Sequence, residues 1–166
     1  MFPVVVNPRM VRIGLAGEGE GLSRRAALLK DACVEPVPVA ADAGKEALRG
    51  LSVLLIAGLE RPEALAQRAR EAGVLVNVED RPELCDFHIP AVVRRGDLVL
   101  TVSTGGRSPG VARRLREWLE RRFGSEWDGR LGELGAVRTR WRNEGVTPGE
   151  ISDRTRRLID EKGWLP

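Results

Sequence analysis

The run at residues 52–57, which is apolar at every position after Ser52, constrains the fold of this chain more than any other feature. A strand that is apolar along its whole length must be buried on both faces, which is typical of a parallel sheet covered by helices on each side. Further runs at residues 11–15, 74–78 and 98–102 alternate with segments of helical spacing. This rhythm predicts an α/β fold with about five strands in a doubly wound parallel sheet.

A glycine-rich turn lies between the first strand and the first helix. In a dinucleotide site, Gly17 would permit the tight turn and Gly19 would let backbone N–H groups approach a pyrophosphate at the helix N-terminus. The third small position holds Leu22, and Gly21 stands one place early. The turn therefore favours a Rossmann-like, dinucleotide-binding sheet, and a plain strand-to-helix turn is the alternative.

Two aspartates follow strands at the predicted carboxyl edge of this sheet, where ligands bind in open α/β folds. Asp42 stands about twenty positions beyond the glycine turn, where an acidic residue often holds the ribose hydroxyls of a dinucleotide. An ordinary loop aspartate is the alternative there. Asp80 follows the apolar run at residues 74–78, and a helix N-cap is its structural alternative.

The last third of the chain has the pattern of a small helical lobe. Gly105 and Gly106 predict a turn, followed by Ser108 as an N-cap and Pro109 at the first helical position. Apolar residues then recur at helical spacing and predict one buried face: Val111, Leu115, Trp118 and Leu119. We expect a Rossmann-like domain over residues 1–106 and a helical lobe over residues 107–166.

Residues 77–119 resemble the signature of the siroheme synthase N-terminal module family. The resemblance rests on Asn77-Val78-Glu79-Asp80, on Pro82-Glu83-Leu84-Cys85-Asp86-Phe87, and on Ser103-Thr104-Gly105-Gly106-Arg107-Ser108-Pro109 before an arginine-rich helix. It implies NAD-dependent oxidation of precorrin-2 to sirohydrochlorin in siroheme biosynthesis. Ferrous iron is then a candidate second substrate, inserted by a ferrochelatase (lyase) reaction. The family's essential aspartate falls on Asp80, which would accept protons in both reactions.

The resemblance also implies the remaining site residues and an interlocked homodimer formed by the helical lobe. The candidate cofactor-binding residues are Gly17, Gly19, Glu20, Gly21 and Asp42. The candidate substrate-binding residues are Asn77, Thr104, Gly105, Gly106, Arg107 and Arg113. The two arginines would bind substrate carboxylates through bidentate hydrogen bonds, and a solvated helix face is the alternative explanation for them.

Some residues depart from the family pattern and motivate a competing hypothesis. Glu18 adds a carboxylate near the expected phosphates, the connection after Asp42 is short, and Ala57-Gly58-Leu59 stands where the family has Ala-Thr-Asp. A non-catalytic relative that binds a tetrapyrrole or a protein partner, but has lost the NAD site, would show such changes.

Composition and charge exclude several classes of function. Residues 1–90 hold 11 Lys and Arg against 13 Asp and Glu, whereas residues 91–166 hold 16 against 11. This basic second half lacks tyrosine and interleaved aromatics, so nucleic-acid binding ranks last. No apolar run is long enough to span a membrane and no secretory signal is present, which predicts a cytoplasmic protein. A single histidine and two cysteines, Cys33 and Cys85, predict no metal site and two buried thiols.

Overall fold

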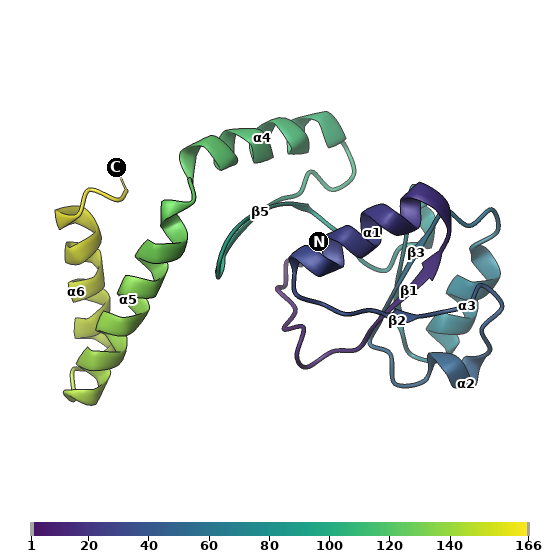
Figure 1. Cartoon of the computed structure of the whole chain (residues 1–166), viewed down its shortest axis with the longest axis horizontal. Coiled ribbons are helices and arrows are strands. Elements are labelled where there is room, and N and C mark those ends of the chain that lie inside the picture. Colours follow the sequence, from purple (N-terminus) through teal and green to yellow (C-terminus); the bar gives the residue numbers. More distant parts are fainter. Residues whose placement is uncertain (1, 166) are drawn as a thin grey trace. The chain divides into compact units, whose positions relative to one another are not determined.

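The computed structural model describes residues 2–165, and the chain divides into two compact units between Ile89 and Pro90 (Figure 1). The first unit contains a sheet of four parallel strands in the order β2-β1-β3-β4. Its elements in chain order are β1 (Ile13–Gly17), α1 (Gly19–Asp31), β2 (Val37–Pro38), α2 (Lys45–Leu48), β3 (Val53–Ala57), α3 (Glu63–Glu71), β4 (Leu75–Val78) and the 3-10 turn η1 (Pro82–Leu84).

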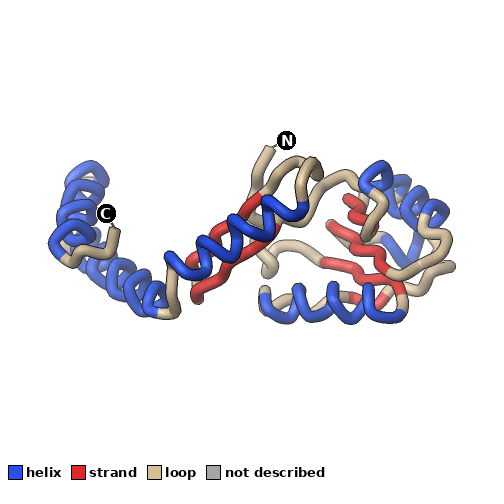
Figure 2. Tube along the Cα trace, turned by 90° about the horizontal axis from the view of Figure 1, so that it is seen from above, coloured by secondary structure: helices blue, strands red, loops and turns tan. Residues whose placement is uncertain are grey.

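Helices cover both faces of this sheet (Figure 2). Successive side chains of a strand point to opposite faces, so the apolar run of β3 supplies both cores. Leu54 and Ile56 pack with Leu65 of α3 on one face, whereas Leu55 packs with Leu29 of α1 on the other. The predicted doubly wound α/β architecture is confirmed for residues 13–78.

The second unit begins with an antiparallel hairpin and continues as three helices. Its elements are β5 (Ala91–Arg95), β6 (Leu98–Val102), α4 (Pro109–Arg122), α5 (Glu126–Asn143) and α6 (Pro148–Glu161). The prediction that residues 98–102 extend the parallel sheet is wrong. Only Gly96 and Asp97 separate β5 from β6, and a parallel connection needs a dozen or more residues. The division expected after residue 106 falls inside this unit.

Helix α4 has the predicted cap, because the Ser108 hydroxyl accepts a hydrogen bond from the Val111 N–H at 3.3 Å. Its apolar face, however, is not buried as predicted. Val111, Leu115 and Trp118 are 50%, 45% and 54% exposed. Helical spacing identifies an apolar stripe but not what covers it, and the second unit leaves about half of each of these three side chains exposed.

The cysteine prediction is also wrong in part, because Cys33 is exposed and only Cys85 is partly buried. Cys33 follows the C-terminus of α1 with a positive φ of 55°, a position where helices usually place glycine. Within residues 2–165, no helix is long and apolar enough to cross a membrane.

Candidate functional site

The carboxyl ends of the parallel strands lie at one edge of the sheet in the first unit. Register places Gly17, the last residue of β1, beside Ala57, the last of β3, and pairs Ile56 with Val78 of β4. Asp42 follows β2, and Asp80 follows β4. The candidate residues from three separate strand ends therefore share the edge at which ligands bind in such sheets.

The turn after β1 packs backbone to backbone against the end of β3. Gly17 has φ +143°, and a Cβ atom there would lie 1.7 Å from the Ala57 carbonyl oxygen. A Cβ on Gly58 would lie 2.1 Å from the Glu18 carbonyl oxygen. The Glu18 N–H also donates to the Ala57 carbonyl at 3.1 Å. Both positions thus require glycine. This requirement explains why Gly58 stands where the family has threonine.

The N-terminus of α1 is open at the position where a dinucleotide site holds its phosphates. Gly19 opens the helix with φ +64°, and a Cβ built on it meets no atom within 4 Å. Its N-cap residue, Glu18, makes no side-chain capping bond within the described chain. Gly21 is buried, and a Cβ there would lie 2.5 Å from the Glu79 Oε2. A Cβ on Gly21 would also lie 3.1 Å from the Gly58 backbone nitrogen, so Gly21 provides the close packing against the sheet that the fingerprint assigns to its third glycine.

Glu79 is the charged residue of this edge that sequence reasoning did not select. Its side chain is 16% exposed and lies 3.3 Å from the Arg24 Nη2 and 3.7 Å from the Arg25 Nε. Arg24 also lies 3.5 Å from Glu20, whose side chain is 96% exposed. The Arg25 Nε is buried and lacks a hydrogen-bond partner in the described chain. The sole sequence signal for Glu79 is its place directly after the apolar run at residues 74–78.

Asp80 is exposed and has a positive φ of 57°, a conformation that few residues other than glycine, asparagine and aspartate adopt. The N-cap of η1 is Arg81, and no side chain caps that turn in the described residues. Nor does the Asp80 carboxylate take part in a hydrogen bond or ion pair there. The geometry thus gives no support to the capping alternative and leaves this carboxylate free at the sheet edge.

Neighbouring side chains hold the turn that contains Asp80. The Cys85 thiol accepts from the Val78 N–H at 3.2 Å and donates toward the Arg81 carbonyl at 3.3 Å. The Arg81 guanidinium donates to Glu63 at 2.7 Å and to Glu83 at 2.5 Å. This hydrogen bond from Arg81 lowers the pKa of Glu83. The pKa of Glu63 is lowered by its own backbone N–H and then by Arg81.

The Cys-Asp-Phe part of the signature closes the outer edge of β4. Asp86 satisfies both backbone polar groups of Val76. The Asp86 N–H donates to the Val76 carbonyl, and the Asp86 Oδ2 accepts from the Val76 N–H, each at 2.8 Å. Asn77 is 5% exposed, and its Nδ2 donates to the Phe87 carbonyl at 2.9 Å. These bonds replace those of a further strand. Contact of Asn77 with a substrate stays a prediction.

Asp42 lies in an exposed turn that α3 holds in place. The Arg68 guanidinium donates to the carbonyls of Ala43 and Ala41, at 2.8 and 3.0 Å, on either side of Asp42. The Asp42 carboxylate itself has no bonding partner among residues 2–165. It is therefore available to accept hydrogen bonds from a ligand.

The other candidates belong to the second unit. The Thr104 hydroxyl donates to the Ser108 carbonyl at 3.1 Å and accepts from the Ser108 N–H at 3.3 Å, which closes the turn of Gly105 and Gly106. Arg107 is exposed. Arg113 donates to Glu117 at 3.1 Å, and this hydrogen bond lowers the pKa of Glu117. Thr104 thus shapes the turn before α4, whereas binding of substrate by these residues stays a prediction.

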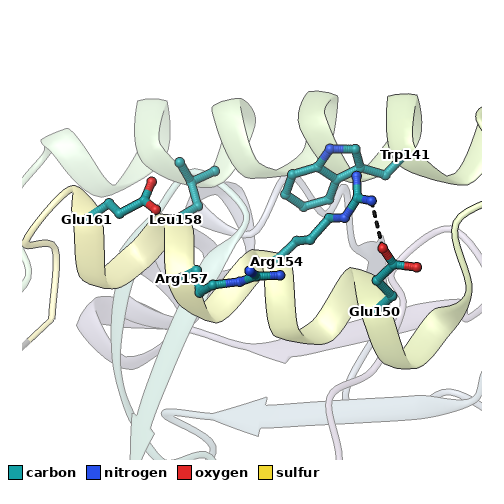
Figure 3. A pocket seen from close by; sticks show the side chains of 6 residues that line it. All are labelled: Trp141, Glu150, Arg154, Arg157, Leu158 and Glu161. Carbon is teal, nitrogen blue, oxygen red and sulfur yellow. Dashed lines mark hydrogen bonds and ion pairs between the residues drawn. The ribbon is translucent and has the colours of Figure 1, made fainter.

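A pocket of about 420 Å³ lies between α5 and α6, and none of the predicted site residues lines it (Figure 3). Arg154 donates to Glu150 at 2.7 Å within it and lies over the Trp141 ring at 5.7 Å. Its other lining residues are Arg157, Leu158 and Glu161. No group of three or more His, Cys, Asp or Glu in the described residues is arranged to hold a metal ion.

Comparison with known proteins agrees with this geometry. Residues 34–91, which include Asp42 and Asp80, match a family described as putative NAD(P)-binding. A siroheme synthase of Nitrosococcus oceani is 33% identical over 186 aligned positions, covering 97% of this chain and 38% of that protein. A siroheme synthase of Azotobacter vinelandii is 35% identical over 189 aligned positions, covering 92% of this chain and 40% of that protein. The chain belongs to the siroheme synthase N-terminal module family.

This member of the family spans about two fifths of the length of these relatives. Both alignments are longer than its own 166 residues, so the relatives contain positions that it lacks. A solved structure named "SirC, precorrin-2 dehydrogenase" matches with a TM-score of 0.76 at 20% identity, covering 100% of this chain and 93% of that one. This likeness confirms the Rossmann-like fold. The family match supports a nicotinamide dinucleotide as cofactor.

Proposed function

We propose that this chain oxidises precorrin-2 to sirohydrochlorin with NAD, as a step of siroheme biosynthesis. The observation that carries the proposal is the free, exposed carboxylate of Asp80, at the same sheet edge as the glycine turn of β1. The siroheme synthase relatives and the name of the matched solved structure, a precorrin-2 dehydrogenase, support the choice of substrate.

The reaction removes two hydrogens from the tetrapyrrole, one as a hydride and one as a proton. NAD, when bound, accepts the hydride. Asp80 accepts the proton, because it is a carboxylate that no neighbouring side chain in the described chain already occupies. The bonds from Cys85 and Arg81 fix the turn on either side of Asp80, so they hold the position of the proton acceptor.

The residues at the carboxyl edge would divide the cofactor between them. Gly17, Gly19 and Gly21, with Glu20, form the turn against which the phosphates lie, and the α1 N-terminus supplies partial positive charge. Asp42 accepts hydrogen bonds from the adenosine ribose hydroxyls. A carboxylate there repels the additional phosphate of NADP, which favours NAD.

The same proposal gives the second unit its role. Its candidate substrate-binding residues are Thr104, Gly105, Gly106, Arg107 and Arg113, of which the arginines would bind carboxylates of the substrate. Asn77 is the candidate substrate-binding residue of the first unit. We assign cofactor binding to the first unit, which ends at Ile89, and dimerisation to the second, which begins at Pro90. We place the reaction in the cytoplasm.

The exposed stripe of α4 supports a homodimer. Val111, Leu115 and Trp118 stand at spacings of four and three residues, so they form one apolar face, each about half exposed. A second copy of the chain would bury this face. Leu115→Glu should convert the dimer to a monomer in sedimentation velocity, whereas Arg114→Glu, a neighbouring exposed position, should leave it intact.

The test of the activity is anaerobic incubation of the purified chain with precorrin-2 and NAD. We expect NADH to form in step with sirohydrochlorin. Calorimetry with each ligand distinguishes the competing possibility of a non-catalytic relative, because tight tetrapyrrole binding without NAD binding would contradict the dehydrogenase. Adding ferrous iron and sirohydrochlorin without NAD tests chelation separately, since Asp80 would also accept the pyrrole protons that iron displaces.

A further inference from the structure

The guanidinium of Arg24 lies beside the first turn of α1. Its Nη1 is 3.5 Å from Glu20, the second residue of the helix, and its Nη2 is 3.3 Å from the Glu79 Oε2. That same Oε2 lies so close to Gly21 that a Cβ there would be 2.5 Å away. This placement follows from helix geometry, because side chains lean toward the N-terminus of their own helix.

Arg24 and Arg25 differ in how firmly they are held. Arg24 is 59% exposed and bridges two carboxylates, so little surface is uncovered when it moves. Arg25 is 17% exposed and has Glu79 as its ion-pair partner in the described chain, at 3.7 Å. Arg25 therefore stays with Glu79 and continues to compensate its charge when Arg24 leaves.

We propose that Arg24 binds the pyrophosphate of the dinucleotide cofactor, and that Glu79 and Glu20 hold it at the turn until the cofactor arrives. The inference rests on the proposed function and assigns a side chain to a contact that the glycine turn otherwise makes through backbone N–H groups alone. A guanidinium matches two phosphate oxygens with parallel hydrogen bonds, and a diphosphate carries more charge than either carboxylate. Exchange of partners at Arg24 therefore favours the bound state.

The test is calorimetric binding of NAD and of ADP-ribose, which keeps the pyrophosphate but lacks the nicotinamide. Arg24→Gln should weaken both ligands by the same factor, about tenfold for the loss of a charge-assisted contact. Arg24→Lys keeps the positive charge but cannot make two parallel hydrogen bonds, so its affinity for both ligands should lie between those of the wild type and Arg24→Gln. Arg49→Gln is the matched control. Arg49 is 66% exposed and pairs with Glu46 at 3.0 Å, but it precedes the amino end of β3, whereas the proposed cofactor site lies at the carboxyl ends of the strands. The control should bind both ligands as the wild type does.

Each alternative result overturns the inference. If Arg24→Gln melts at the wild-type temperature and binds both ligands normally, Arg24 is not a cofactor ligand, while NAD binding by the wild type leaves the proposed function standing. Weaker binding of NAD but not of ADP-ribose would place Arg24 at the nicotinamide end of the cofactor instead. A loss matched by Arg49→Gln would be a general effect of charge. Absence of dinucleotide binding in the wild type would remove both the inference and the dehydrogenase.

Discussion

Replacing Asp80 separates its chemical role from its backbone role. The residue has φ +57°, where a side chain with a Cβ atom costs about 1–2 kcal/mol, less for aspartate and asparagine and nothing for glycine. Stability should therefore rise by about 1 kcal/mol in Asp80→Gly, change little in Asp80→Asn, and fall by about 1 kcal/mol in Asp80→Ala. Since the carboxylate has no bonding partner in the described chain, no further loss is expected.

Activity should follow a different order from stability. If Asp80 accepts the proton, all three variants lose it equally, and the rate should fall about a hundredfold or more in each. Thermal melting and the initial rate of NADH formation, measured on one preparation, give both quantities. Asp31→Asn is the control, because Asp31 is an exposed carboxylate at the C-terminus of α1, whereas the glycine turn of the proposed site lies at the N-terminus of that helix. An Asp80→Asn protein that oxidises precorrin-2 within a few-fold of the wild-type rate would refute the catalytic role.

Four further substitutions test the local backbone geometry and one ion pair. Cys33→Gly should raise the unfolding free energy by about 1 kcal/mol, because φ there is +55°, as chemical denaturation would show. Gly58→Ala should lower it by at least about 2 kcal/mol, since the new Cβ would lie 2.1 Å from a backbone oxygen, whereas Gly19→Ala, which meets nothing within 4 Å, should cost only about 1 kcal/mol. Arg81→Gln should lower the melting temperature at neutral pH but not in acid. Arg81 depresses the pKa of Glu83 below its ordinary value of 4.5, so this stabilisation is complete above that pH and disappears as the pH falls through the folded-state pKa.

Local patterns predicted the first unit well because its signals are short in range. The apolar run of β3 required burial on both faces, and the glycines after β1 required a tight turn before a helix. The same reasoning failed at residues 98–102, where an apolar run fits a parallel strand and a hairpin equally well. The two-residue connection before β6 decides between them, and it becomes visible only once β5 is recognised as a strand.

The charged cluster at Glu79 was hidden for a different reason. Arg24 and Glu79 are 55 positions apart, and no periodicity links a residue after one strand to a residue on the helix after another. Gly21 shows the same limitation. It stands one place early by the fingerprint, yet a Cβ there would meet Glu79 and the backbone of Gly58. Such contacts depend on how elements cross, which is set by the packing of the whole unit.

The Cys-Asp-Phe segment shows how a signature can carry structure and function together. A strand at the edge of a sheet exposes unpaired N–H and C=O groups, and β4 is such a strand. Asp86 and Cys85 bond the backbone of Val76 and Val78 in place of a fifth strand. Because this closure begins five residues after Asp80, it also fixes the turn in which the free carboxylate sits. If Asp80 is the proton acceptor, as proposed, this segment would contribute to catalysis without touching the substrate, because it sets the position of the Asp80 carboxylate.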